Sequence, residues 1–225
     1  MKIIFASSFN NIAKDENGKK HAVPMSDDNL FLTNLRKYTP KFDCVVMVAN
    51  DPTSFEITDF YADLLFQSLK LSGLDFKTKV VFDNRNKDRA KEIIPNADLI
   101  FLSGGKVDVQ NEFFKNIEMA KLLQTTSGLI VGGSAGAMNL CETVLCFPNF
   151  IKGIGLWNKI IVPHFDGANK LYMRDGNDEY NNLMDLSVGR ELIGIDENSY
   201  LLLTNKEVVP FGNIFRVTNK NCQRY

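Results

Sequence analysis

Short, continuously apolar segments alternate with longer amphipathic segments along the first part of the chain. The apolar runs are only a few residues long, which is typical of strands buried on both faces. They predict strands at residues 3–6, 44–49, 79–82, 99–102 and 129–131. Regular alternation of such strands with helices indicates a parallel sheet covered by helices on both sides.

The segments between these runs carry apolar residues at helical spacing. Helices are expected from Ser26 or Asp27 to about Tyr38, from Asp51 to a cap at Gly73, and at 87–94, 108–123, 135–140 and 178–188. In the longest of them, the stripe expected to face the core is Ile57, Phe60, Tyr61, Leu64, Leu65 and Leu69. The polar stretch 7–28 is expected to be a long loop.

The pattern changes towards the C-terminus. Short apolar runs predict strands at 159–162, 192–195, 200–203, 208–209 and 214–217, joined by tight turns such as Asn205-Lys206 and Gly212-Asn213. With no repeat, linker or low-complexity tract, residues 1–225 are expected to form one α/β domain, with a mostly parallel sheet followed by antiparallel C-terminal strands.

Composition narrows the class of protein. The 225 residues are 44% hydrophobic with a net charge of −1, which disfavours nucleic acid or an anionic membrane as the main partner. The N-terminal run is a poor signal peptide and no apolar stretch approaches the roughly 20 residues of a membrane span, so a cytoplasmic location is expected. The four cysteines form no CxxC pair and no metal-like group with histidine, so no metal is expected.

The segment with the clearest chemistry joins the run 129–131 to the following helix. Gly132-x-Ser134-x-Gly136 matches the GxSxG nucleophile elbow, where a serine sits on a sharp strand-to-helix turn. The glycines leave room for that turn, and the helix start directs backbone N–H groups at a developing oxyanion. A phosphate-binding turn or a plain tight turn is the alternative interpretation.

A serine nucleophile needs a base, and the chain has two histidines. His21 lies in the early polar loop, where a solvated side chain is expected. His164 follows the strand expected at 159–162, after Pro163, at the sheet edge where Ser134 is expected. His164 is therefore the candidate base.

The acid that would orient the base is less well determined. Only Glu142 lies between Ser134 and His164, and it is expected to point away, which disfavours the Ser–acid–His order of α/β-hydrolases. Candidates after the histidine are Asp166, Asp175, Asp178, Asp196 and Glu197. Asp196 and Glu197 follow a strand directly, although they could also be exposed turn carboxylates.

Several of these motifs together resemble a known family. Gly-Gly-Ser-Ala-Gly-Ala at 132–137, Pro-His-Phe at 163–165, Gly-Ile-Asp-Glu-Asn at 194–198 and Ser-Gly-Gly at 103–105 are similar to peptidase family S51, the aspartyl dipeptidases and cyanophycinases. The resemblance covers nearly the whole chain. It implies a three-layer sandwich, flavodoxin-like and related to class I glutamine amidotransferases.

The resemblance also implies roles for individual residues. The triad would be Ser134, His164 and Glu197, with Asp196 as the alternative acid. The oxyanion donors would be the backbone N–H groups of Gly105 and Ala135. No metal or organic cofactor is implied.

The loop after the paired glycines, which in this family borders the substrate pocket, departs from the family pattern, because Lys106-Val107-Asp108 stands where Asn or Asp and then Thr or Gln often follow. Gly104 is expected to border the substrate. Arg174, with Lys170 as second candidate, is expected to hold an acidic side chain, although either could be a solvated loop charge.

The expected function is therefore a serine peptidase for short peptides, including dipeptides with an N-terminal Asp, acting as a monomer or homodimer. A small-molecule esterase or amidase with the same triad is one alternative. A non-catalytic, amidotransferase-like binding protein is the other.

Overall fold

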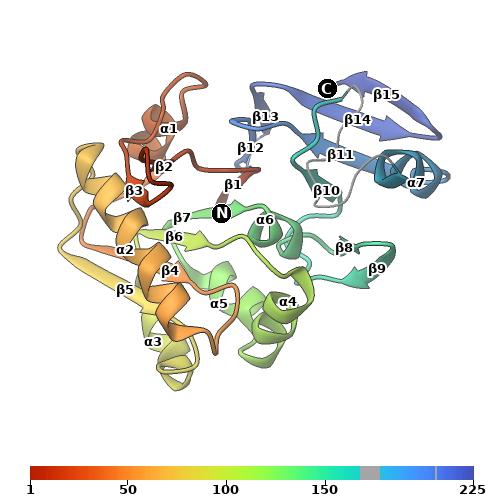
Figure 1. Cartoon of the computed structure of the whole chain (residues 1–225). Coiled ribbons are helices and arrows are strands. Elements are labelled where there is room, and N and C mark those ends of the chain that lie inside the picture. Colours follow the sequence, from red (N-terminus) through yellow and green to blue (C-terminus); the bar gives the residue numbers. More distant parts are fainter. Residues whose placement is uncertain (168–177, 206) are drawn as a thin grey trace.

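A mixed sheet of seven strands forms the centre of the computed structural model, which describes residues 1–167, 178–205 and 207–225. The strand order is β13-β12-β1-β7-β6-β4-β5, and the five strands from β1 to β5 in this order run parallel (Figure 1). The bounds are β1 Lys2–Ala6, β4 Cys44–Val48, β5 Thr78–Phe82, β6 Leu99–Leu102, β7 Leu129–Gly133, β12 Tyr200–Leu203 and β13 Val208–Phe211. β12 and β13 pair antiparallel at the β1 side.

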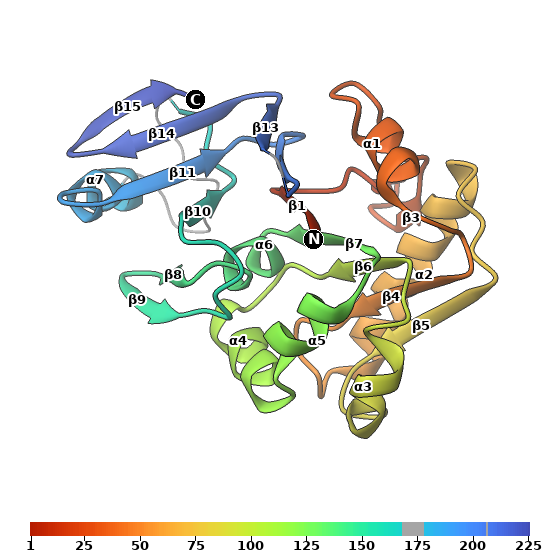
Figure 2. The same ribbon diagram turned by 180° about the vertical axis from the view of Figure 1, so that it is seen from behind.

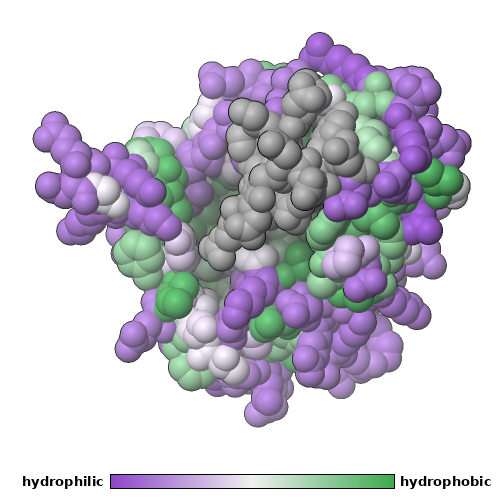
Figure 3. Space-filling view, turned by 45° about the vertical axis from the view of Figure 1, so that its right-hand side comes forward, coloured by the Kyte–Doolittle hydropathy of each residue, from purple (hydrophilic) through white to green (hydrophobic). Residues whose placement is uncertain are grey.

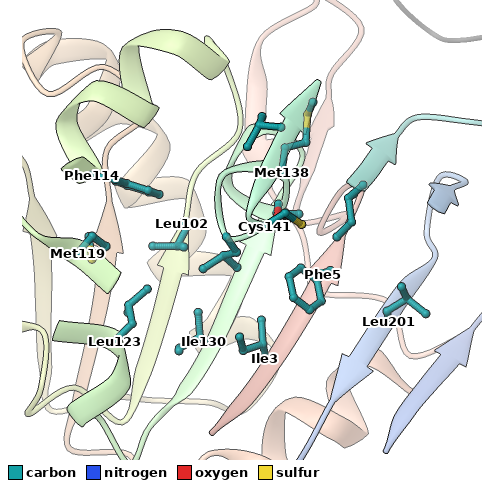
Figure 4. Close-up of a cluster of buried hydrophobic side chains, with 14 of the residues drawn as sticks. Ile3, Phe5, Leu102, Phe114, Met119, Leu123, Ile130, Met138, Cys141 and Leu201 are labelled. Carbon is teal, nitrogen blue, oxygen red and sulfur yellow. Dashed lines mark hydrogen bonds between the residues drawn. The ribbon is translucent and has the colours of Figure 1, made fainter. Parts of the chain in front are cut away.

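Helices cover both faces of this sheet. The bounds are α1 Phe31–Tyr38, α2 Phe55–Leu71, α3 Ala90–Ile93, α4 Val107–Asn116, α5 Met119–Thr125 and α6 Ala135–Asn139. Alternate residues of each strand point to opposite faces, so Ile3 and Phe5 pack with α3 to α6, whereas Ile4 and Ala6 pack with α1 and α2. Figure 4 shows part of the first cluster, with Phe114 and Leu123 reaching towards the strands.

A second sheet lies beside the β1 and β7 side of the molecule. Its four strands are β10 Ile160–Pro163, β11 Glu191–Ile195, β14 Ile214–Thr218 and β15 Asn221–Arg224, in the order β10-β11-β14-β15. β10 and β11 are parallel and the other pairs are antiparallel. Helix α7, Asp178–Leu186, lies next to this sheet in both ribbon views (Figures 1 and 2).

The fold class predicted from the sequence is confirmed: a mostly parallel sheet between helical layers, with antiparallel C-terminal strands. Among the described helices, none is both long and apolar enough to cross a membrane. The face shown in Figure 3 is largely hydrophilic, with apolar residues scattered among charged ones.

The expected loop at 7–28 is wrong in part. It contains a hairpin of β2, Ile12–Lys14, and β3, Lys20–Ala22. The Asp15 carboxylate accepts the N–H groups of Asn17 and Lys19, which closes the turn. Each of these strands is only three residues long, too short to show apolar alternation in the sequence.

Two helices differ from the expected bounds. The first begins at Phe31, because Leu30 is in the left-handed region with φ 60° and is exposed. Leu30 is therefore the N-cap in place of the expected Ser26 or Asp27, although the Asp27 carboxylate, three residues earlier, accepts the Thr33 N–H at 2.8 Å. The helix expected at 108–123 is two helices, separated at Glu118, which has φ 54°.

The apolar stripe expected on the longest helix is also partly wrong. Leu64, Leu65 and Leu69 are buried as expected, but Ile57 and Phe60 are 62% and 47% exposed. The same turns of α2 bury Thr58 and Ala62, so the covered face there runs through small residues rather than through Ile57 and Phe60. Large apolar side chains at helical spacing therefore did not identify the buried face at this end of the helix.

Three further strands have no counterpart in the sequence-based expectation. β8, Thr143–Cys146, and β9, Asn149–Lys152, form a hairpin directly after α6. β15 adds an exposed edge to the second sheet, and its sequence Asn-Cys-Gln-Arg has almost no apolar pattern.

Candidate active site

Ser134 occupies the single residue between β7 and α6. Its backbone has φ 48° and ψ −115°, a combination that costs a non-glycine residue about 1–3 kcal/mol. Hydrogen bonds hold it there: its N–H donates to Ala6 O at 2.9 Å, and its C=O accepts the Met138 N–H at 3.0 Å. The strain turns the side chain out at the carboxyl end of the sheet.

The two glycines of the motif allow α6 to pack closely against the sheet. A Cβ on Gly132 would lie 2.7 Å from the Ala137 nitrogen, and one on Gly136 would lie 2.3 Å from Leu102 O. Both contacts are to backbone atoms, which cannot rotate away as a side chain does. The steric reason inferred for these glycines is therefore confirmed.

His164 reaches Ser134 from the second sheet. It follows β10 directly, and its φ of 57° turns the chain sharply. The imidazole Nε2 lies 3.0 Å from the Ser134 Oγ. The backbone N–H of His164 donates to the hydroxyl oxygen of the buried Ser7 at 3.0 Å, which attaches the base to the end of β1.

Glu197 contacts the opposite side of the imidazole. Its Oε1 lies 2.5 Å from His164 Nδ1, and its Oε2 accepts the Ser8 hydroxyl at 2.7 Å. β10 and β11 are parallel with Pro163 opposite Ile195, so the residues that follow each strand leave the sheet side by side.

Asp196, the alternative acid, faces elsewhere. Its Oδ2 accepts the Asn213 amide at 3.1 Å, and its Oδ1 accepts the Glu197 N–H at 2.8 Å. Of the two neighbouring carboxylates, the structure therefore places Glu197 against the imidazole and Asp196 against the turn after β13.

The environment of Glu197 favours its charged form. The hydrogen bond with His164 is the largest influence that lowers the pKa of Glu197, and the Ser8 hydroxyl lowers it further. Partial burial acts in the opposite direction but does not outweigh them. A carboxylate, rather than a carboxylic acid, therefore faces the imidazole.

The glycine turn after β6 lies against Ser134. A Cβ on Gly104 would be 3.1 Å from the Ser134 Cβ. Gly105 has φ 143°, and a Cβ there would lie 2.3 Å from the Oδ1 of Asn50. That Asn50 side chain accepts the Lys106 N–H at 2.7 Å and donates to Lys106 O at 3.0 Å, which fixes the turn.

Ala135 is buried at the first position of α6. The first N–H groups of a helix have no partner within the helix, so this position can offer a donor to a ligand. The turn of Gly104 and Gly105 follows β6, and Ala135 comes directly after Ser134 at the end of β7, so both lie at the same end of two neighbouring strands.

A buried polar network supports this arrangement from behind. Asn139 of α6 donates to Val107 O at 3.0 Å and to Gln110 Oε1 at 3.1 Å, and accepts the Asn111 amide at 2.8 Å. Gln110 in turn donates to Ser103 O at 2.7 Å. The network joins α6 to the start of α4 and therefore to the glycine turn.

Sequence reasoning missed Ser7, Ser8 and Asn50, as well as the network of Gln110, Asn111 and Asn139. The sequence held a signal for Ser7, Ser8 and Asn50. Ser7 and Ser8 follow β1, and Asn50 lies just after β4, at the edge where ligands bind parallel sheets. The network carries a weaker signal, polar residues at helix positions that are otherwise apolar.

Two expected positions cannot be compared. Arg174 and Lys170 lie outside the described residues, so their placement relative to Ser134 stays a prediction.

His21 lies exposed in β3, as expected. Within the described ranges, no three His, Cys, Asp or Glu side chains gather closely enough to hold a metal ion.

Comparisons with known proteins identify the family and the fold. The family profile of peptidase family S51 matches residues 52–210. A search of curated proteins found no match. A crystal structure of a peptidase from an acI-B1 Actinobacterium superimposes with a TM-score of 0.72 at 20% identity, over 100% of this chain and 93% of that one.

A putative peptidase E from Listeria monocytogenes EGD-e superimposes with a TM-score of 0.61 at 14% identity, over 93% of this chain and 96% of that one. At these identities the two structures establish the shared fold, and the family profile establishes the relationship in sequence. The chain therefore belongs to peptidase family S51 and is a serine-type peptidase.

Proposed function

We propose that this peptidase hydrolyses short peptides with Ser134 as nucleophile, His164 as general base and Glu197 as the acid that orients the base. The observation that carries the proposal is the line of contacts from Ser134 Oγ to His164 Nε2, at 3.0 Å, and from His164 Nδ1 to Glu197 Oε1, at 2.5 Å. Nucleophile and base within hydrogen-bonding reach, with the base oriented by a third group, are the geometric signature of this chemistry.

The protonation states follow from the partners. An ionised carboxylate can only accept a hydrogen bond, so Glu197 keeps the proton of the neutral imidazole on Nδ1. Nε2 is then left with a lone pair towards Ser134. This tautomer is the one that can remove the serine proton.

The reaction would proceed through an acyl-enzyme. Ser134 Oγ attacks the peptide carbonyl carbon while its proton moves to His164 Nε2, and the carbonyl oxygen becomes an oxyanion. His164 returns the proton to the leaving amine as the C–N bond breaks. Water then repeats the sequence on the ester, which releases the acid and restores Ser134.

The N–H groups of Gly105 and Ala135 are proposed to bind the oxyanion. The support is the position of Ala135 directly after Ser134, the contact of the glycine turn with Ser134 at Gly104, and the attachment of that turn through Asn50. Donors fixed before the reaction need no reorganisation when charge develops, and losing one typically costs about 10²- to 10³-fold in turnover.

The proposed substrates are dipeptides with an N-terminal Asp. The support is membership of the family, in which aspartyl dipeptidases occur, and Arg174 is the cation proposed to bind the acidic side chain. Lys106, exposed directly after Gly105, marks where this chain departs from its family, and it makes the substrate preference a question for measurement.

The test is a panel of Asp-, Glu-, Asn- and Ala-leading dipeptides, assayed with the natural protein and with Ser134→Ala. We expect the highest kcat/KM for the Asp-leading dipeptide, and a loss of about 10³- to 10⁶-fold in turnover with Ser134→Ala. Ser127→Ala, the same change at the exposed opposite end of β7, is the matched control and should retain full activity. Full dipeptidase activity in Ser134→Ala would refute the proposed mechanism.

A further inference from the structure

We infer that Ser8 is a positioning residue that holds the Glu197 carboxylate in place for catalysis. The inference rests on the proposed function, because it concerns the same triad. The contact that carries it is the hydrogen bond from Ser8 Oγ to Glu197 Oε2 at 2.7 Å, between residues 189 positions apart in the chain.

The loop that carries Ser8 begins at the edge of the central sheet that carries Ser134. β1 lies between β7 and β12, and Ala6 is opposite Gly133, so the residue after β1 emerges beside Ser134. β12 runs antiparallel, so the turn before it, which contains Glu197, reaches the same edge. The nucleophile, Ser8 and the acid thus meet at one end of three adjacent strands.

Residues 7–10 bind the acid-bearing turn along its length. Ser7 Oγ donates to Ile195 O at 2.6 Å, and the Ser7 N–H donates to Ser199 O at 3.4 Å. Beyond Ser8, the Asn10 amide donates to the Asn198 side chain. Of these contacts, only that of Ser8 reaches the carboxylate itself.

An aromatic anchor keeps this loop in place. Phe9 lies over Gly133, where a Cβ would come within 2.4 Å of its ring. The same ring lies edge-on to the Phe101 ring, with 5.1 Å between the ring centroids, and stacks on the Phe31 ring, with 6.2 Å between the centroids. Because Phe9 is packed among neighbours on both sides, the preceding Ser8 is held at a defined position.

The carboxylate needs such a partner. The Glu197 side chain is 39% exposed, so water could draw the carboxylate away from the imidazole. With Oε1 on His164 and Oε2 on Ser8, both oxygens are engaged and the plane of the carboxylate is defined. Ser7 has a different role, because its hydroxyl bonds only backbone groups.

The first experiment measures kcat and KM of Ser8→Ala, with the dipeptide from the panel that has the highest kcat/KM. A hydrogen bond to a charged group is typically worth enough that kcat should fall about 10-fold, with KM unchanged. Ser8→Thr, which keeps the hydroxyl, should recover most of the activity. Ser127→Ala is the matched control, and thermal unfolding of each variant shows whether it is folded.

The second experiment combines Ser8→Ala with Glu197→Ala. If Ser8 acts through Glu197, removing it from a protein without that carboxylate should change kcat less than about 2-fold. An equal fold-loss in both backgrounds, or natural activity in Ser8→Ala, would overturn the inference.

Ser134→Ala separates the two ideas. If Ser134→Ala is inactive while Ser8→Ala is fully active, only the role of Ser8 is refuted. If Ser134→Ala is fully active, the proposed function itself fails.

Discussion

The two halves of the candidate site are held in different ways. Ser134 follows a strand of the central sheet, and its position is set mainly by the residues around it in the chain, the end of β7, two glycines and the start of α6, with one hydrogen bond to Ala6 of β1. His164 and Glu197 belong to the second sheet, and their contacts reach back to Ser7 and Ser8 at the end of β1. One half is built by local geometry, and the other by contacts between distant segments.

This difference predicts different responses to mutation. A change in the local half should damage packing around the turn, because the glycines there have backbone atoms as neighbours. A change in the distant half should damage chemistry before stability, because those contacts involve partly exposed side chains. The variants below test this contrast.

The largest effect is expected for His164→Ala. Without the base, kcat should fall by at least about 10³-fold while KM changes little, because the imidazole acts in the transition state. His21→Ala is the matched control, since His21 is exposed in the β2–β3 hairpin and should leave kcat unchanged. Steady-state kinetics on both variants is the measurement, and an equal loss of kcat in the two would contradict the role of His164 as base.

Gly136→Ala should have the largest effect on folding. The Cβ of alanine at this position would lie 2.3 Å from Leu102 O. Such overpacking typically lowers the free energy of unfolding by about 1–3 kcal/mol. At Gly155, which has φ 79° and nothing within 4 Å of a Cβ, alanine adds backbone strain without a collision. Urea unfolding should therefore find Gly155→Ala the less destabilised of the two, and the reverse order would show that the close approach is not limiting.

A loss of stability of comparable size is expected for Asn139→Ala. The change leaves the Asn111 amide and the Gln110 oxygen, both buried, without this partner, at a cost of about 2 kcal/mol. The exposed Asn116 at the end of α4 is the control, and its replacement by alanine should change the free energy of unfolding by less than about 0.5 kcal/mol. Denaturant unfolding curves with equal slopes for the two variants would make the comparison valid.

The smallest effect is expected from the charge of Glu197. Its pKa is lowered in the folded protein, so the ionised carboxylate stabilises the fold above the pKa of the unfolded chain, and this stabilisation is lost as the pH falls through the folded-state pKa. The difference in Tm between the natural protein and Glu197→Gln should therefore shrink below about pH 4, near the ordinary pKa of glutamate. A difference that grows on acidification would contradict the lowered pKa. Glu16→Gln, at an exposed position, reports the effect of losing a surface carboxylate.

Prediction from sequence succeeded where a structure depends on neighbours in the chain. The buried strands were recognisable because each is continuously apolar, and Gly132 and Gly136 marked the turn at Ser134. It failed where strands of three residues pair with each other, as in β2 with β3, and where a helix buries small residues instead of large apolar ones, as at Thr58 rather than Ile57. In those places the stabilising partner is not visible in the local pattern.

By itself, the sequence determined the alternation of strands and helices, the strained turn at Ser134 and the short list of histidines and carboxylates that could serve it. Only the tertiary structure placed Glu197 rather than Asp196 beside His164, and brought Ser8 from the start of the chain to the far side of that carboxylate. The physical reason is the distance along the chain between the residues that interact. Helix and strand patterns report contacts within a few residues, whereas hydrogen bonds between distant segments depend on how two sheets pack and which strand ends coincide.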